Sequence, residues 1–410
     1  MAPMRPIYLL IMAALAATAM PATAQLGLPP IGLPPLGDVT DTISDTLEDT
    51  NAGIARASGK LLRIRDNRIA NLLRNHADAV ERDRNGDPAR RGELFLLDAD
   101  PDALAIAQQA GFVIRGAEQI DGLDIGLVRL SVPSSLSLAD AEKTLQALLP
   151  DATISADNLH FPASGSNASP PLAMLTSSTA SIRSAVGMID GAPGNHVRPS
   201  AMRGFAQGAP YPSNHGSAIV SLLEHAGVKD IRVADVYGND PAGGNALAIA
   251  QALGWLTKGG AKVISISLVG PRNALLERAV ASVQREGVIV VAAVGNDGPA
   301  APPAYPASYD SVLAVTAVDG RNRALIEAGK ARHLDYAAPG AGLRVRNAEG
   351  ERTRVRGTSF AVPLVAARVA AYPGDRSQII TQLDKEAIDL GKKGTDDTYG
   401  RGLLCGDCRP

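Results

Sequence analysis

Short segments of aliphatic and β-branched residues alternate with helical patterns through the second half of this 410-residue chain. The apolar segments are centred on Val186, Val233, Ile264, Val290 and Val315. Helical patterns occupy residues 248–256 and 275–285 between them. A strand that is apolar on both faces must be covered on both faces, so this alternation predicts a parallel sheet with helices on either side. The expected fold class is therefore doubly wound α/β.

Polar side chains stand where three of these strands end. Asp190 follows the apolar run 185–189, Ser267 follows the run around Ile264, and Asn296 follows the run around Val290. Open sheets of this class bind their ligands in a crevice at the carboxyl ends of the strands. We therefore expect these three side chains to lie at one crevice.

Ser359 lies in the segment Gly-Thr-Ser-Phe-Ala-Val-Pro, residues 357–363, which opens a helix of small residues at 364–371. The start of a helix offers unpaired N–H groups and a partial positive charge, which suit an oxygen that becomes an anion during acyl transfer. We interpret Ser359 as a nucleophile. The alternative is a hydroxyl that caps a buried helix.

A nucleophilic serine needs a base and a carboxylate that orients the base. Four of the six histidines lie outside any recognisable motif: His76, His160, His225 and His333. Of the other two, His215 stands at the start of an apolar helical face at residues 214–223, which suits a fixed base, whereas His196 is interpreted as structural. Asp190 is the orienting acid, with an Asp-Gly turn as the alternative.

Asn296 ends the strand pattern of residues 287–298 in the sequence Gly-Asn-Asp-Gly. A side-chain amide at this place can donate a hydrogen bond to an oxyanion. The alternative is an ordinary turn.

The acid, base, amide and nucleophile follow in the order Asp190, His215, Asn296 and Ser359, and in this residues 180–404 resemble the subtilisin-like serine proteases. The fixed positions of the family's Gly-Thr-Ser-x-Ala-x-Pro pattern are all met at 357–363. The resemblance implies a serine-type endopeptidase, a hydrolase that works through an acyl-enzyme.

The resemblance also implies a strand at residues 263–270 that pairs with the substrate backbone. Its substrate-binding residues would be Ser267, Leu268, Val269 and Gly270. Val269 stands where the family usually has glycine, so its branched side chain would narrow the cleft and favour small residues in the substrate. The interval from Asp190 to His215 is 25 residues (215 − 190), somewhat shorter than the family norm, which suggests a trimmed surface loop.

The first 24 residues have the features of a signal peptide: Arg5, an apolar run at 7–20 and Ala-Thr-Ala at 22–24. We expect export to the periplasm or the exterior. Residues 25–51 begin with a Leu-Gly-Leu-Pro-Pro repeat and are interpreted as a proline-rich linker. Residues 52–91 carry a basic amphipathic helical pattern, for which membrane-surface contact by 52–84 is the alternative to packing on a neighbour.

Residues 92–162 alternate strand and helix patterns, with strands at 94–97 and 123–132 and helices at 103–110 and 139–149. The family resemblance implies that this α+β domain is a propeptide, which would make the chain a self-maturing zymogen. The linker 163–179 would hold the maturation site, and 180–410 would be the catalytic domain. A permanent N-terminal module is the alternative.

Composition limits the partners. The formal net charge of −2 and the pI near 6.3 give no sign of a nucleic-acid partner, which leaves protein or peptide substrates and the chain's own propeptide. No cofactor is expected, and a structural calcium ion is not readable from the sequence. Cys405 and Cys408 can close a small disulfide in an oxidising compartment.

Two other functions remain open at this stage. One is a catalytically silent binding protein with the subtilase fold, and the other is an acyl transferase or cyclase that uses the same triad.

Overall fold

The computed structural model describes residues 36–163 and 181–406, with side chains from residue 56 onward. The chain divides into two compact units, 1–53 and 54–410, so all of these side chains belong to the second unit. Helix α1, Leu36–Asn75, contains the boundary between the units. The signal peptide, most of the linker 163–179 and Cys408 fall outside the described residues.

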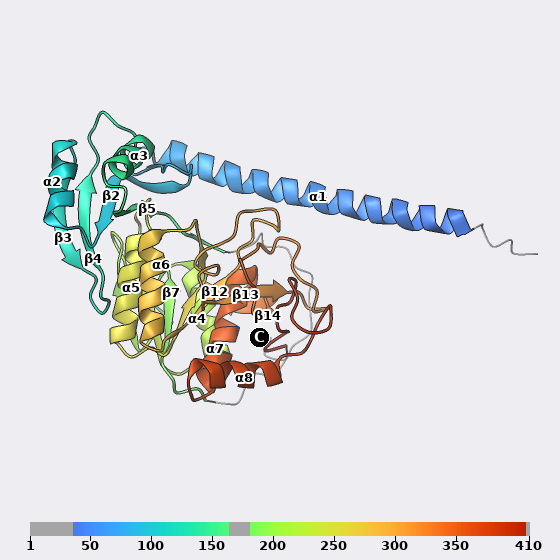
Figure 1. Cartoon of the computed structure of the whole chain (residues 1–410). Helices are drawn as coiled ribbons and strands as arrows, with labels where there is room; N and C mark the ends of the chain where they lie inside the picture. Colours follow the sequence, from blue (N-terminus) through green and yellow to red (C-terminus); the bar gives the residue numbers. More distant parts are fainter. Residues whose placement is uncertain (1–35, 164–180, 407–410) are drawn as a thin grey trace, which may run out of the picture. The chain divides into compact units, whose positions relative to one another are not determined.

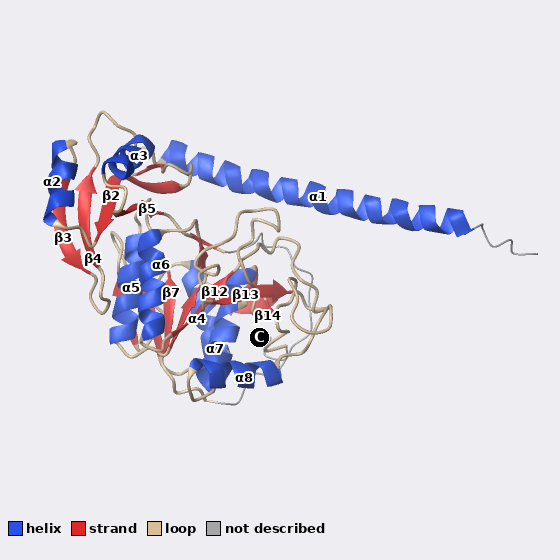
Figure 2. Cartoon of the chain, viewed as in Figure 1, coloured by secondary structure: helices blue, strands red, loops and turns tan. Residues whose placement is uncertain are grey.

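A seven-stranded sheet forms the centre of the larger domain (Figures 1 and 2). All of its strand pairs are parallel. In spatial order the strands are β14 (Tyr336–Pro339), β13 (Leu313–Val318), β12 (Ile289–Ala293), β10 (Val263–Ile266), β7 (Val186–Asp190), β9 (Ile231–Asp235) and β8 (Ala201–Gly204). The predicted doubly wound α/β fold is confirmed.

Helices cover both faces of this sheet, as Figure 1 shows. The helices of the domain are α4 (Asn214–His225), α5 (Ala246–Lys258), α6 (Ala274–Arg285), α7 (Val362–Ala371) and α8 (Arg376–Glu386). Alternate residues of one strand enter two different hydrophobic clusters: Val290 packs with α5 and α6, and Val291 packs with α4 and α7. This two-sided burial explains why the central strands are largely apolar.

The chain reverses its direction of travel across the sheet at β7. Strand β9 lies on one side of β7, and the next strand in the chain after α5, β10, lies on the other side. A reversal of this kind opens a crevice at the carboxyl ends of the strands. Asp190 is the last residue of β7, so it stands at that crevice.

Besides the main sheet and the N-terminal sheet, the described residues contain four short strands that form two pairs. Strand β11 (Leu268–Val269) pairs with β6 (Phe161–Pro162), and β15 (Ala341–Arg346) pairs with β16 (Arg352–Arg356). The first of these pairs joins the domain to the segment that precedes it in the chain, and it proves central to the site.

The N-terminal domain is an antiparallel sheet with two helices. Its strands are β1 (Val80–Arg82), β2 (Pro88–Leu97), β3 (Val113–Gln119), β4 (Gly126–Ser131) and β5 (Thr153–Asn158), and its helices are α2 (Pro101–Gln109) and α3 (Leu138–Leu148). The expected strands at 94–97 and 123–132 and both expected helices correspond to β2, β4, α2 and α3. Strands β1, β3 and β5 were not expected.

The boundaries before this domain differ from the expectation. The 40-residue helix α1 begins at Leu36, inside the expected linker 25–51, and ends at Asn75, well before residue 91. No proline occurs between Pro35 and Pro88, so nothing stops a helix directly after the proline repeat. The domain itself begins near Val80. Gly92, taken as its start, lies inside β2 at a positive φ of 69°, beside an irregularity in the β2–β5 pairing.

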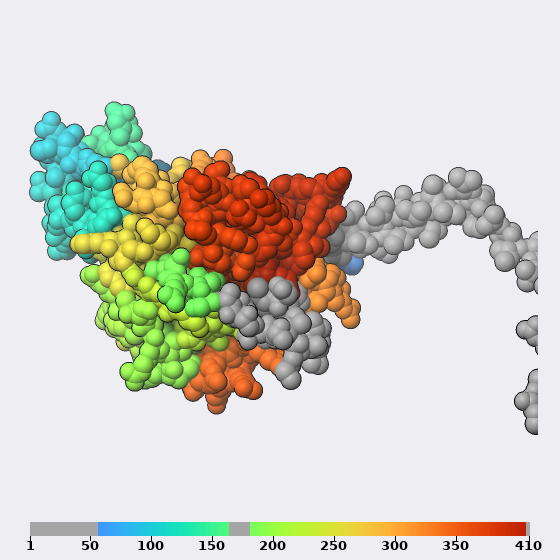
Figure 3. Space-filling view, turned by 90° about the horizontal axis from the view of Figure 1, so that it is seen from below, coloured from blue at the N-terminus to red at the C-terminus, as the bar shows by residue number. Residues whose placement is uncertain are grey.

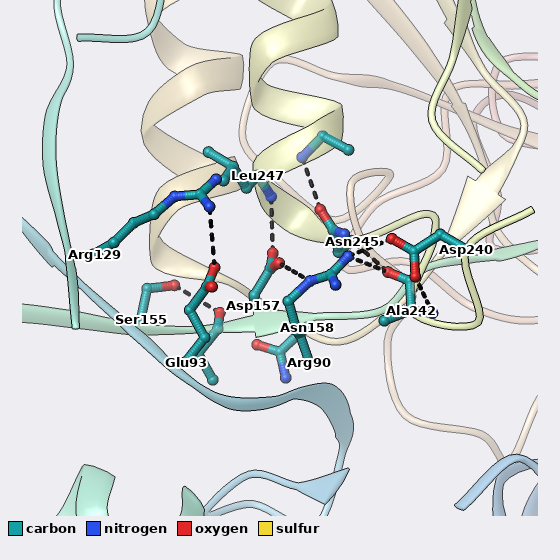
Figure 4. Close-up of polar contacts among 12 residues, drawn as sticks. Arg90, Glu93, Arg129, Ser155, Asp157, Asn158, Asp240, Ala242, Asn245 and Leu247 are labelled. Carbon is teal, nitrogen blue, oxygen red and sulfur yellow. Dashed lines mark hydrogen bonds and ion pairs between the residues drawn. The ribbon is translucent and has the colours of Figure 1, made fainter. Parts of the chain in front are cut away.

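The last strand of the N-terminal domain packs against the starts of α5 and α6. In the space-filling view the N-terminal sheet (cyan) lies directly against the yellow and gold surface of these helices (Figure 3). Figure 4 shows the polar contacts there: the carboxylate of Asp157 accepts a hydrogen bond from the Leu247 N–H at 3.0 Å and lies 3.4 Å from Arg90 Nε. Arg90 also reaches Asp240 at 2.7 Å.

Asn273 joins the same strand to α6. Its side-chain oxygen accepts from the Leu276 N–H at 3.0 Å and so caps the helix, while its amide donates to the Ala156 carbonyl at 2.7 Å. The side chain is buried. One residue therefore serves the helix and the contact between the two domains.

We expect Asn273→Ala to lower the free energy of unfolding by about 2–4 kcal/mol, because it removes a helix cap and the buried hydrogen bonds from the Asn273 amide to the Ala156 carbonyl and the Asn158 side chain. Ser137→Ala is the matched control, since Ser137 caps α3 at an exposed position and should cost about 1 kcal/mol. Urea denaturation in a Ser359→Ala background measures both. Equal losses in the two variants would contradict the role given to Asn273.

Candidate active site

The carboxylate at the end of β7 holds the imidazole at the start of α4. Nδ1 of His215 lies 2.9 Å from both carboxylate oxygens of Asp190. Asp190 is 1% exposed, so the pair is shielded from water on the acid's side. Nε2 of His215 is buried and has no hydrogen-bond partner among the described residues. The imidazole is thus fixed by one nitrogen and unpaired at the other.

Local sequence explains how these two elements approach so closely. Ser213 caps α4 by accepting from the Gly216 N–H at 2.9 Å, which places His215 in the first turn. A Cβ on Gly216 would overlap the carbonyl oxygen of Gly191, the residue after Asp190. The Asp-Gly and His-Gly pairs are therefore required for the end of β7 to meet the start of α4.

Ser359 lies in a 3-10 turn, Thr358–Phe360, directly before α7. The residue is buried, and its hydroxyl donates to the Ser267 carbonyl at 3.2 Å. The ring of the next residue, Phe360, packs 5.3 Å from the His215 ring between centroids. Ser359 and His215 are thus neighbours that share no hydrogen bond in this state.

Asn296 is oriented by the residue before Ser359. The Thr358 N–H donates to the side-chain oxygen of Asn296 at 3.0 Å, so the amide nitrogen points the other way. That nitrogen donates to the carbonyl oxygen of Ala163, which also accepts from the Ser359 N–H at 3.1 Å. One carbonyl oxygen of the chain thus receives two donors, one of them from the backbone of Ser359.

The segment that carries this carbonyl runs through the cleft as an extended strand. Strand β6 pairs antiparallel with β11, with Phe161 opposite Val269 and Pro162 opposite Leu268. The Ala163 N–H continues the ladder by donating to the Ser267 carbonyl at 3.1 Å. All four residues expected to bind substrate, 267–270, therefore lie along residues 160–163, which we call the tail.

The other edge of the tail is held by the loop before α5. The His160 N–H donates to the Gly244 carbonyl at 2.8 Å, and the Tyr237 hydroxyl donates to the His160 carbonyl at 2.8 Å. The imidazole of His160 is fully buried and packs on Gly270, where a Cβ would overlap the ring. The tail is thus a central strand bonded on both sides.

Val269 lies on the same face of the tail ladder as Phe161 and Ala163, because side chains alternate along strands. Its γ-carbons lie 3.6 and 3.7 Å from the position that a Cβ on Gly295 would take, and the Ala304 Cβ lies 3.7 Å from the same point. These two side chains flank the space next to Gly295. Ala163 itself is 2% exposed.

Two ionisable groups of this segment have shifted pKa values. Burial raises the pKa of Asp157 from 3.8 to about 7, the carboxylate having lost its water. Burial lowers the pKa of His160 from 6.5 to about 4, because an imidazolium there would also lose its water. The Nε2 atom of His160 has no hydrogen-bond partner in the described part of the chain.

Sequence motifs singled out some of these groups and missed others. The structure brings together Asp190, His215, Asn296, Ser359 and Ser267. His196 is exposed and lies against Gly350. Ala163, His160 and Asp157 were not identified as site residues, and the one local signal was a Phe-Pro-Ala sequence before a run rich in serine and glycine.

The described residues contain no cluster of three or more His, Cys, Asp or Glu side chains that could hold a metal ion. No helix among them is long and apolar enough to cross a membrane. Cys405 is disulfide-bonded.

Comparison with known proteins identifies the family. The model of the subtilase family matches residues 207–402, which include His215, Asn296 and Ser359 but not Asp190. Subtilisin Savinase of Lederbergia lenta is 32% identical over 197 residues, which are 47% of this chain and 70% of that protein. Subtilisin DY of Bacillus licheniformis is 37% identical over 176 residues, or 40% of this chain. The chain belongs to the subtilase family, as the sequence predicted.

The extent of these matches differs among relatives. The matched part spans 63% of subtilisin DY and 30% of the minor extracellular protease Epr of Bacillus subtilis. The solved structure of fervidolysin from Fervidobacterium pennivorans superposes with a TM-score of 0.63 at 15% identity, over 78% of this chain and 61% of that one. This last likeness concerns the fold.

If the chain is cut beyond the tail, the two shifted groups predict a particular pH dependence for release of the tail from the cleft. Between pH 6.5 and about pH 4, His160 is protonated when the tail is released but neutral when the tail is bound. Acidification through this range therefore weakens binding of the tail. A released Asp157 gives up a proton that the bound residue keeps, so acidification strengthens the bound state from about pH 7 down to 3.8. The two effects oppose each other over nearly the same range.

We therefore expect release from the wild type to vary little between pH 6.5 and 4. In Asp157→Asn, release should accelerate by up to about tenfold per pH unit on acidification, because His160 then acts alone. Size-exclusion chromatography of the cut protein gives the release rate. The double variant with His160→Phe should again be flat, and a pH-independent Asp157→Asn single variant would contradict the assignment.

Proposed function

We propose that this chain is an exported serine endopeptidase that first cuts its own Ala163–Ser164 bond and then hydrolyses other peptides. The observation that carries the proposal is the carbonyl of Ala163, which receives hydrogen bonds from Asn296 and from the Ser359 N–H beside the Asp190–His215 pair. A substrate carbonyl must occupy this position for a serine to attack it.

The reaction follows from the groups present. The Ser359 hydroxyl attacks the Ala163 carbonyl carbon and gives its proton to His215 Nε2, the nitrogen that is unpaired in the resting state. The carbonyl oxygen becomes an anion held by its two donors. His215 then returns the proton to the departing Ser164 nitrogen as the C–N bond breaks, which leaves an acyl-enzyme. Water, deprotonated by His215, releases the Ala163 carboxylate and restores Ser359.

Asp190 acts through His215. Its carboxylate accepts from Nδ1, which keeps the proton of the neutral ring on that nitrogen and leaves Nε2 as the acceptor. The carboxylate also stabilises the imidazolium that forms during the attack.

The N-terminal domain is proposed to be the propeptide. It would inhibit the enzyme because its tail occupies the cleft as an extended strand bonded on both sides. Since the tail is tethered to both domains, its effective concentration at Ser359 is high, and its own bond should be the first one cut. The signal-like first 24 residues support export.

The nucleophile and base can be tested together. A fluorophosphonate should label wild-type protein at Ser359, and Ser359→Ala or His215→Ala should lower casein hydrolysis by roughly 10⁵- to 10⁶-fold, a magnitude taken from a subtilisin. His196→Ala is the control and should keep most of its activity, because His196 is exposed on the surface. Casein hydrolysis by Ser359→Ala at the wild-type rate would refute the proposal.

The proposal names one bond for maturation. Mass spectrometry of purified wild type should find a fragment that ends at Ala163 and another that begins at Ser164, whereas Ser359→Ala should stay uncut there. If the first cut lies elsewhere in 165–179, the register of the tail in the cleft is wrong.

Val269 is proposed to select a small residue before the cut bond. In Val269→Gly the two γ-carbons above Gly295 disappear, so kcat/KM for a peptide with Phe in place of Ala at that position should rise about 10- to 100-fold relative to the Ala peptide. Peptides that differ only at this residue measure the ratio. An unchanged ratio would remove Val269 from the selection.

A further inference from the structure

Helix α1 contacts the catalytic domain as well as the N-terminal domain that follows it in the chain. Leu72 and Leu73 pack with Val80 of that domain, as expected of a helix that precedes it. Leu61, about three turns earlier, approaches Gly298 of the catalytic domain, where a Cβ would lie 2.9 Å from its Cδ1. Residues 61–73, which we call the latch, therefore touch both domains.

Two arginines of the latch contact one carboxylate of the catalytic domain, and one of them, Arg65, also lies 3.6 Å from Asp87 of the N-terminal part. Arg68 Nη2 lies 3.3 Å from Asp297 Oδ2, and Arg65 Nε lies 3.6 Å from the same oxygen. Asp297 follows Asn296, the residue whose amide holds the Ala163 carbonyl. The latch is thus anchored one residue away from the group that holds the end of the tail.

The latch also touches the tail itself. The guanidinium of Arg68 lies over the Phe161 ring, 5.3 Å from its centroid. Phe161 is paired on its other side with Val269. The tail is therefore enclosed between β11 and α1 at this point.

A cavity of about 380 Å³ lies beneath the latch. Ile69 and Phe161 line it from the N-terminal part, and Val269, Gly295 and Ala304 line it from the catalytic domain. Val269 is the partner of Phe161 in the tail ladder, so this cavity adjoins the tail. The latch therefore lines the cavity together with the tail and the cleft residue Val269.

We propose that Asp297 and Gly298 form a docking surface for a basic helix, and that the latch occupies it to keep the tail in the cleft after the Ala163–Ser164 bond has been cut. The inference rests on the proposed function, because it concerns what happens after that cut. Cutting the bond is then not enough for activity, since the latch must also leave.

The ion pairs of Asp297 with Arg65 and Arg68 suit a contact that can break and let the latch leave. The side chains of Asp297, Arg65 and Arg68 are 19%, 23% and 41% exposed. Ion pairs exposed to this degree are weak and are screened by salt. Release of the tail should therefore depend on ionic strength through these two arginines.

The first experiment compares full-length wild type with Arg65→Gln/Arg68→Gln. Cutting at 163–164 is followed on gels, and release of the N-terminal fragment by size exclusion, at about 0.05 M and about 0.5 M salt. We expect equal cutting rates. The variant should release the fragment about 3- to 10-fold faster at low salt, and salt should accelerate release more in the wild type than in the variant, where the exposed ion pairs Lys258–Asp121 and Arg278–Asp98 still join the two domains.

Arg63→Gln/Arg74→Gln is the matched control, because these arginines are exposed on the same helix and Arg74 bonds to Asn71 within it. It should behave as the wild type does. Equal release from the Arg65→Gln/Arg68→Gln variant and the wild type at both salt concentrations would overturn the proposal.

A charge exchange tests the anchor directly. Arg65→Asp/Arg68→Asp should release the fragment fastest, and addition of Asp297→Arg should restore slow release. Release is scored only on protein that gels show to be cut, so a slower cut in the triple variant is not counted as slow release. Release as fast as in the double variant would remove Asp297 as the anchor.

A final experiment uses protein that cannot cut its own chain. In uncut Ser359→Ala protein, hydrogen exchange at the Ala163 amide should speed up about 3- to 10-fold when Arg65→Gln/Arg68→Gln is added. If wild type never cuts its chain but this difference in exchange appears, the proposed function is wrong and the proposed role of the latch is supported. If the chain is cut but exchange at Ala163 is unchanged, the proposed role of the latch is wrong and the proposed function is supported.

Discussion

The site depends on two hydrogen bonds that meet at one oxygen, the carbonyl of Ala163. One donor is the backbone of Ser359 and the other is the amide of Asn296, so the turn before α7 and the loop after β12 must both be in place. The acceptor comes from the far end of the N-terminal domain. These bonds therefore require that three distant parts of the chain be correctly folded at once, and they set the tail in register with β11.

Sequence patterns predicted the central strands of the catalytic sheet well, because β7, β10, β12 and β13 are buried on both faces and are largely apolar. The N-terminal sheet was predicted in part. Strand β3 is mostly exposed and contains Arg115 and Gly116, so it lacks the apolar signal of a strand. Strand β5 carries Asp157 and Asn158, residues depleted in strands, and they are buried there because helices α5 and α6 of the other domain bind them or their neighbours.

The residues of the site differ in the same way: some are defined by their sequence neighbours and others by contacts with distant parts of the chain. Asp190, His215 and Ser359 could be found from short motifs, because each stands at the end of a strand or the start of a helix that its own neighbours define. Ala163 and His160 could not, since their places depend on pairing with residues about a hundred positions later in the chain. The pairing of α1 with Asp297 is longer still in sequence and leaves no local pattern.

The contacts of β5 with the starts of α5 and α6 also affect the order in which the two domains fold. The N-terminal domain leaves the ribosome first and can fold before residues 246–285 emerge. It then presents the Asp157 carboxylate to the Leu247 N–H and the Ala156 carbonyl to Asn273 while those helices form. If the proposed cut releases the domain, an unfolded catalytic chain must form the same helix ends without these partners. Folding before that cut would then be easier than refolding after it.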